Sequence, residues 1–289
     1  MRYLMIANPL QNFFLEPISE TFLVKALLLS ILVCCVCGYL SCYMTLKGWA
    51  LMGDAVSHAV MPGVVVAYAL SLPFSLGAFI FGVGSTVLIG FIKQKSRIKE
   101  DTVIGLIFTG FFAFGLVLRS QVISHIDLTH ILFGSSLGTD SYDVAQTLII
   151  SAIVLSLLLI YRRDLMLYCF DATHARSIGI NTAFLHYLLL SVLSLSAVAG
   201  LQTVGIILIV AMLVTPGATA YLLTDRFDRM NLLAILSSVT SSVVGFYISY
   251  WCDFPPGATI VLVQTIIFLI AFLFAPRYGI FKSQITHQP

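Results

Sequence analysis

Charge is scarce in this sequence. Only 10% of its 289 residues are Asp, Glu, Lys or Arg, whereas a soluble domain carries about a quarter. Hydrophobic residues make up 59% of the chain, and its mean hydropathy is +1.02. Because so few charged side chains cannot cover a water-soluble surface, we predict an integral membrane protein. The net charge of +2, with the basic residues spread over short loops, argues against nucleic-acid binding.

The sequence also lacks a phosphate-binding loop. It contains no G-x-x-x-x-G-K-[ST], and the nearest approach, Lys95-Ser96, follows Gln94 rather than glycine. If ATP drives the work of this protein, another chain must therefore bind the nucleotide.

Cysteine provides no framework for a disulfide or zinc site. Four of the six cysteines lie in one apolar run (Cys34, Cys35, Cys37 and Cys42), without a second Cys or His pair at zinc spacing. We favour small residues packed at a helix interface over a thiolate metal site. Recurrent glycines also indicate close helix packing: Gly77, Gly82, Gly84, Gly105, Gly110 and Gly115.

Nine apolar segments approach the length of about 20 residues that a helix needs to cross a bilayer. Lipid offers no partner to an unpaired backbone group, so each segment is expected to be helical. We predict an all-α membrane protein, a polytopic helical bundle of about 8–9 transmembrane helices in a single domain over residues 1–289, with residues 1–20 as an amphipathic lead-in. One segment could be re-entrant. The segments are Phe22–Leu46, Ala50–Leu72, Pro73–Ile92, Thr102–Leu118, Ala145–Tyr161, Leu185–Ala199, Thr203–Leu223, Leu232–Trp251 and Ala258–Ala275.

The basic residues predict the orientation. The loops after the first, third, fifth, seventh and ninth segments hold twelve of the 15 Lys and Arg residues. By the positive-inside rule these loops are cytoplasmic. The N-terminus then lies outside and the C-terminus inside, if the number of spans is odd.

Two longer loops stand out in this arrangement. Residues 121–143 are poor in Lys and Arg and fall outside, where a partner or solute could meet them. Residues 162–182 form a cytoplasmic loop, in which Asp171–Gly179 could be a short surface helix with Asp171 as its N-cap and Gly179 as its stop. An ordinary solvated connector is the alternative.

The second segment opens with a carboxylate and an imidazole, which are costly inside a membrane. Asp54 and His58 are four residues apart, so on a helix they share one face and could share a cation. Ser57 lies beside them, and Pro62 would loosen the helix and free carbonyl groups. Oxygen and imidazole ligands without thiolate suit Mn, Fe or Zn. The alternative is a structural pair at a helix interface.

The seventh segment carries a second interruption at Thr215, Pro216 and Gly217. Proline removes a helical hydrogen bond, so the backbone there is expected to be bent or broken. Broken helices line the pathways of many transporters. A simple kink in a packed helix would fit equally well.

Taken in order, these stretches resemble the integral membrane subunit of bacterial ABC importers for divalent metals, the manganese, iron and zinc permeases. The matching motifs are LKGW (46–49), GDAVSHAVMPG (53–63), EDTVIGLIFT (100–109), HILFG (130–134), FDATHARSIG (170–179), QTVG (202–205), TPGATA (215–220) and APRYG (275–279). Two more, YLLTDRF (221–227) and YISY (247–250), are most similar to the Yfe/Sit type, which is associated with chelated iron and manganese.

The resemblance implies a type II ABC importer-like fold and a set of partners. These are a cytoplasmic ATP-binding subunit, a periplasmic or surface metal-binding protein, and a second copy or paralogue of the permease, all at the bacterial inner membrane. It also implies a transported divalent metal (Fe, Mn or Zn) with no permanently bound cofactor, and a pathway metal site at Asp54 and His58. The other residues expected to act are Ser57, Pro62, Thr215 and Pro216 along the pathway, and Asp171, His174, Ala175, Arg176 and Gly179 in coupling to the ATPase.

We therefore expect a permease subunit, not itself an enzyme, of an ATP-driven importer for iron or manganese, with zinc possible. The first alternative is a secondary transporter driven by an ion gradient, with Asp54 as its titrating group. The second alternative, an intramembrane enzyme, has little support, because adjacent residues such as Ser57 and His58 point to different faces of a helix.

Overall fold

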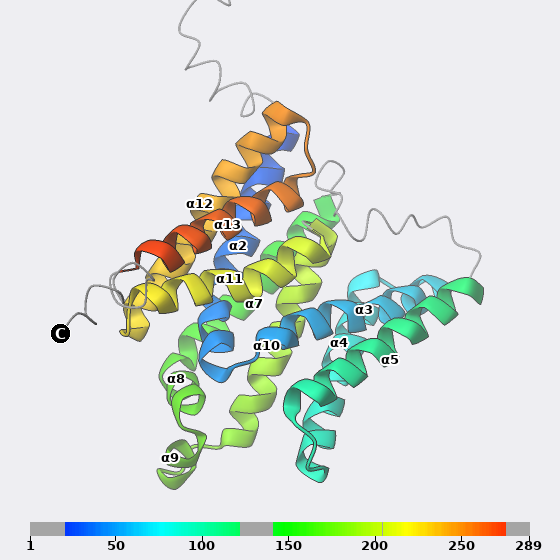
Figure 1. Ribbon diagram of the computed structural model, residues 1–289. Helices are drawn as coiled ribbons and strands as arrows, with labels where there is room; N and C mark the ends of the chain where they lie inside the picture. Colours follow the sequence, from blue (N-terminus) through cyan, green and yellow to red (C-terminus); the bar gives the residue numbers. More distant parts are fainter. Residues whose placement is uncertain (1–20, 122–140, 204, 276–289) are drawn as a thin grey trace, which may run out of the picture.

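The computed structural model describes residues 21–121, 141–203 and 205–275 (Figure 1). The predicted lead-in 1–20, nearly all of the 121–143 loop and the chain after Ala275 lie outside these residues. Every regular element within the described ranges is a helix. The helices are α2 (Thr21–Lys47), α3 (Ala50–Ala69), α4 (Phe74–Lys95), α5 (Glu100–Gln121), α7 (Ser141–Ile160), α8 (Arg162–Phe170), α9 (Ala172–Ser177), α10 (Thr182–Thr203), α11 (Ile206–Leu223), α12 (Phe227–Cys252) and α13 (Pro256–Phe274).

All nine predicted apolar segments coincide with helices, which confirms the all-α bundle. In the described part of the chain, seven helices are long and apolar enough to cross a membrane. An eighth span results if α7 and α8, which are bent by 70° at their junction, count as one. The apolar stretch of α11 (Leu208–Leu223) is shorter than the rest, because the chain turns at Gly205 (φ +85°), a backbone conformation that glycine adopts readily.

The helices pack in two groups, which are joined by α10 and by the contact of α11 with α3 (Figure 1). In one group α3 packs between α4 and α5, and in the other α2 packs against α11 and α12, which α13 covers. Cys34, Cys37 and Cys42 of α2 are buried, as expected for small residues packed at a helix interface, whereas Cys35 is only partly buried.

Only some of the recurrent glycines lie where two helices pack closely, so the prediction from the glycine pattern is confirmed in part. A Cβ atom on Gly77 of α4 would lie 2.7 Å from Cβ of Ala67 and closer still to the Gly63 carbonyl oxygen of α3. Gly82 and Gly115 also meet a neighbouring helix, whereas a Cβ atom on Gly84, Gly105 or Gly110 would have nothing within 4 Å. The contact between Gly63 and Gly77 brings the backbones of α3 and α4 together.

The basic loops that the structure describes lie toward the lower and left sides of Figure 1, away from the α3–α4 and α12–α13 turns. Lys47, at the end of α2, lies 3.8 Å from the ring centroid of Tyr168 on α8. Arg162 of α8 forms an ion pair with Asp228 of α12. The grouping agrees with the predicted topology. That these loops face the cytoplasm stays a prediction.

Candidate functional site: an aspartate and a histidine on α3

Helix α3 carries its two ionisable residues on a side that the other helices cover incompletely. Most of its residues between Met52 and Val64 are buried. The side chain of Asp54 is 41% exposed and that of His58 is 24% exposed. Leu51, one turn before Asp54, is 52% exposed. The sequence spacing thus placed the pair correctly on one face, and this face is open in the single chain.

The pair has a geometry that a metal ion could bridge. Nε2 of His58 lies 3.4 Å from Oδ1 of Asp54, which is longer than a usual N–H···O hydrogen bond of about 2.9 Å. Two ligands each about 2.1 Å from one ion, at a tetrahedral angle, are about 3.4 Å apart. A carboxylate oxygen and an imidazole nitrogen therefore stand at a separation that a shared divalent ion could bridge.

Two phenylalanines of α5, which the sequence did not single out, pack on the imidazole. The ring of His58 meets Phe108 edge to face at a centroid distance of 4.8 Å and Phe112 at 5.4 Å. These contacts restrict the rotation of the imidazole and hold Nε2 toward Asp54. The spacing of Phe108 and Phe112 indicates that they share one face of a helix. It does not indicate which neighbouring helix that face contacts.

One chain supplies only part of a coordination shell. Within the described ranges no group of three or more His, Cys, Asp or Glu side chains could hold a metal ion. Divalent metals bound through nitrogen and oxygen take four or more ligands. Asp54 and His58 alone would therefore leave a metal ion incompletely coordinated, and water, backbone oxygens or a second chain would have to supply the remaining ligands.

Ser57 and Pro62 lie in the same helix but do not point toward this pair as free ligands. The Ser57 hydroxyl is buried and donates to the Gly53 carbonyl at 2.8 Å. Pro62 is buried against α5, where a Cβ atom on Gly115 would meet its ring at 3.1 Å. Because proline has no N–H, the His58 carbonyl lacks its usual helical donor, yet α3 remains helical through Pro62.

Thr215 and Pro216 lie on α11, which passes beside α3. A Cβ atom on Gly53 would sit 3.2 Å from the Leu213 side chain, so the two helices are in contact one turn from Pro216. The helix continues through Pro216, and the chain breaks instead at Gly205. The Thr219 hydroxyl donates to the Thr215 carbonyl at 2.7 Å. The role of Thr215 and Pro216 in the pathway stays a prediction.

The 171–179 stretch forms the short surface helix that its residues indicated. Oδ1 of Asp171 accepts the backbone N–H groups of Thr173 at 2.8 Å and His174 at 2.9 Å. These hydrogen bonds lower the pKa of the Asp171 carboxyl, and the hydrogen bond from His174 has the larger effect. Ala175 is fully buried, and Gly179 ends the segment at φ +88°. Arg176 and His174 are exposed.

Exposed apolar side chains flank this helix. Phe170 is 60% exposed and Ile178 56% exposed. Solvent-facing apolar residues on either side of a capped, polar helix form a surface that a partner protein could cover.

An aromatic and basic cluster connects this end of the molecule to α3. The Tyr168 hydroxyl of α8 lies 2.9 Å from Nδ1 of His186 on α10. The His186 ring meets Trp49, the residue before α3, at a centroid distance of 5.3 Å. Lys47 covers the ring of Tyr168. Sequence reasoning missed this cluster, since its members come from four separate segments.

Comparison with known proteins places these features in context. The model of the family described as "ABC 3 transport family" matches residues 19–275. The "Manganese transport system membrane protein MntB" of Synechocystis is 54% identical over 98% of this chain and 93% of its own length. The "Chelated iron transport system membrane protein YfeD" of Yersinia pestis is 46% identical over 92% of this chain and 90% of its own.

Solved structures agree with the fold. A chain of "PsaBC from Streptococcus pneumoniae in complex with Fab" superimposes with a TM-score of 0.86 at 40% identity, over 95% of this chain and 99% of that chain. An inward-facing "putative metal-chelate type ABC transporter" gives a TM-score of 0.67 at 16% identity, over 94% and 90% of the two chains. The second likeness concerns the fold alone.

Proposed function

Because this chain belongs to the ABC 3 transport family, we propose that it passes manganese or iron across the bacterial inner membrane as the permease subunit of an ATP-driven importer. The family and the PsaBC likeness confirm the resemblance inferred from the motifs, as well as the fold class. The names of the relatives reported above favour manganese and iron over zinc.

The observation that carries the proposal is the pair on α3. Asp54 and His58 are partly exposed inside an apolar span and stand 3.4 Å apart. A charged group costs about 2.5–3.5 kcal/mol at the centre of a membrane helix on insertion scales. Such a cost is tolerated where the group faces a polar route or a ligand.

Two permeases facing each other would complete the route. Two copies, or this chain and a paralogue, would offer two carboxylates and two imidazoles around one axis. Two ligands from each copy would suffice to pass the ion without holding it permanently. A periplasmic or surface metal-binding protein would deliver the ion to the opposite end from the basic loops.

The energy for transport would come from a separate cytoplasmic ATP-binding subunit, since this chain has no phosphate-binding loop. The capped helix α9 offers a docking element, with Ala175 on its buried side and Phe170 and Ile178 exposed at its ends. His174 and Arg176 would add polar contacts to the ATPase, and Gly179 ends the element.

The cluster around His186 supports a mechanical route from α9 to the metal pair. A shift of α8 moves Tyr168, which is bonded to His186, and His186 packs on Trp49 at the start of α3. Asp54 follows Trp49 by five residues. ATP-driven movement of the docking segment would in this way tilt α3 and alter access to the pair.

Uptake measurements test this function. Cells carrying the complete transport operon should take up radiolabelled manganese or iron, and deletion of this gene should abolish that uptake. Inactivation of the nucleotide site in the ATPase should abolish it too. Uptake that survives loss of the ATPase but collapses with the ion gradient would instead establish a secondary transporter.

A further inference from the structure

A small pocket of about 230 Å³ lies beside the docking helix α9, and we call it the α9 pocket. Its walls come from four helices: the end of α4, the end of α8, α9 itself and the start of α10. The lining residues are Gly90, Lys93, Tyr168, Ala172, Arg176, Thr182, Ala183, His186 and Tyr187.

The α9 pocket is lined by cations without a carboxylate to balance them. Lys93 and Arg176 are both exposed, and neither Asp nor Glu is among the described residues that line the pocket. A third cation, Lys47, lies 3.8 Å from the ring centroid of Tyr168, which forms part of the wall. The charge of the pocket therefore favours an anionic occupant.

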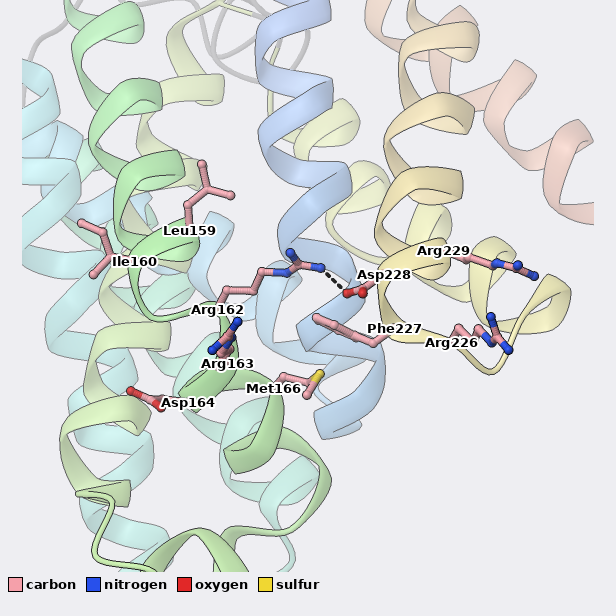
Figure 2. A pocket seen from close by; sticks show the side chains of 10 residues that line it. All are labelled: Leu159, Ile160, Arg162, Arg163, Asp164, Met166, Arg226, Phe227, Asp228 and Arg229. Atoms are coloured by element: carbon pink, nitrogen blue, oxygen red, sulfur yellow. Dashed lines mark hydrogen bonds and ion pairs between the residues drawn. The ribbon is translucent and has the colours of Figure 1, made fainter.

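The larger pocket between the starts of α8 and α12 differs in this respect (Figure 2). Its volume is about 1060 Å³, and its lining includes Asp164 and Asp228 as well as arginines. Asp228 forms an ion pair with Arg162, and Figure 2 shows Arg226 and Arg229 turned away from Arg162. The positive charge there is partly neutralised within the chain and is divided between two sides.

Contacts between the helices bring the polar groups of the α9 pocket together. Arg176 of α9 donates to the Thr182 hydroxyl of α10 at 3.4 Å. His186 follows Thr182 by four residues, so the two share one face of α10. Nε2 of His186 would lie 3.3 Å from a Cβ atom on Gly90 of α4, and Lys93 follows Gly90 by three residues on the same face. One small space thus lies between the two cations and the imidazole.

These groups can donate hydrogen bonds to a carboxylate. The contact with Thr182 takes one of the five N–H groups of Arg176, and a guanidinium binds both oxygens of a carboxylate in a fork geometry. Nδ1 of His186 lies 2.9 Å from the Tyr168 hydroxyl. When that hydroxyl donates to Nδ1, the neutral ring carries its hydrogen on Nε2. Gly90 has no side chain to cover Nε2, so a polar atom that enters the pocket can reach it.

The size and the place of the α9 pocket indicate its occupant. A volume of about 230 Å³ suits a single side chain, and it lies below the range of about 300–1,000 Å³ that small-molecule ligands fill. If α9 docks to the ATP-binding subunit, as proposed above, the occupant comes from that subunit. We propose that it is the side chain of an aspartate or a glutamate, which binds Arg176 and lies beside Lys93 and His186.

This contact would connect the ATP-binding subunit to more than α9. Arg176 belongs to α9 and Lys93 to α4, whereas His186 packs on Trp49 at the start of α3. A carboxylate held among them pulls on the route to the metal pair directly when the ATP-binding subunit moves.

Zero-length crosslinking of the purified, assembled importer tests the contact. A carbodiimide joins a lysine amine to a carboxylate where the two touch, and mass spectrometry identifies the joined peptides. We expect a crosslink from Lys93 to an Asp or Glu of the ATP-binding subunit, with a lower yield in Arg176→Gln. Lys93→Gln should bind the ATP-binding subunit about tenfold more weakly, as expected for the loss of one charge-assisted hydrogen bond. The matched control is Lys95→Gln, an exposed lysine two residues further along α4 on another side of the helix, which should bind as the wild type does.

Charge reversal completes the test. Arg176→Glu should prevent assembly, and arginine in place of the crosslinked acid of the ATP-binding subunit should restore it. An importer that assembles and transports, yet gives no crosslink from Lys93 to the ATP-binding subunit, would overturn the inference and leave the proposed function intact. A permease that binds no ATP-binding subunit would overturn both. Loss of the crosslink in millimolar inorganic phosphate, with binding of the ATP-binding subunit unchanged, would make the pocket a site for a free anion and would also overturn the inference.

Discussion

The packing of α3 on α4 permits a sharp prediction about stability. Replacing Gly77 with Ala places a Cβ atom 2.7 Å from Cβ of Ala67 and closer to the Gly63 carbonyl oxygen. Backbone atoms cannot rotate away, so α3 and α4 must separate. Forcing an extra carbon into a packed core costs about 1–3 kcal/mol. Alanine returns about 0.5–1 kcal/mol as the better helix former, so the packing cost prevails.

Gly84, two turns further along α4, provides the control. A Cβ atom there would have nothing within 4 Å, so Gly84→Ala keeps the gain in helix propensity without the clash. The assay is the midpoint of thermal unfolding of the purified complex, followed by fluorescence-detected size exclusion. Gly77→Ala should melt several degrees below Gly84→Ala, and Gly84→Ala at or above the wild type. Equal midpoints for the two variants would refute the close approach of α3 and α4.

The remaining predictions concern the region of the basic loops. Asp171→Ala should weaken co-purification with the ATPase, whereas Asp171→Asn, which keeps an acceptor oxygen, should weaken it less. The pKa of Asp171 in the folded protein is lowered. Its stabilisation of α9 is therefore complete above the ordinary aspartate pKa of about 4 and is lost as the pH falls through the lowered value. Pull-down of the ATPase at a series of pH values would show this loss. Asp228→Ala should change the unfolding free energy by less than about 1 kcal/mol, since its pair with Arg162 is exposed; a larger change in thermal melts would contradict this. His186→Phe keeps the ring contacts but removes the partner of the Tyr168 hydroxyl, so ATP hydrolysis should continue while uptake per ATP hydrolysed falls; an unchanged ratio would argue against the coupling route.

Much of the fold follows from the sequence because the bilayer imposes a simple rule. Apolar runs of sufficient length must be helices, and all nine were found. The helix α9 was also predictable, since Asp171 and Gly179 are local signals that need no tertiary partner. The pairing of Asp54 with His58 needed only the helical repeat.

The structural features that the sequence did not predict depend on contacts between helices, which a local sequence pattern does not specify. Pro216 does not break α11, which stays helical from Ile206 to Leu223, because membrane helices tolerate proline when their surroundings satisfy the freed groups. The break in this part of the chain falls at Gly205 instead. Phe108 is recognisable as an apolar residue, but its contact with His58 depends on how α5 packs on α3. Gly77 and Gly84 look alike in sequence, and only the packing of α4 separates their roles.

The central claim is that Asp54 and His58 on α3 handle the transported metal. The most direct test measures uptake of radiolabelled manganese and iron in cells that express the complete importer with Asp54→Ala or His58→Ala. The control is Leu51→Ala, which alters an exposed residue one turn away without removing a ligand. Each site variant should assemble with its ATPase and yet lose uptake, while the control transports normally. Normal uptake by both site variants would contradict the account.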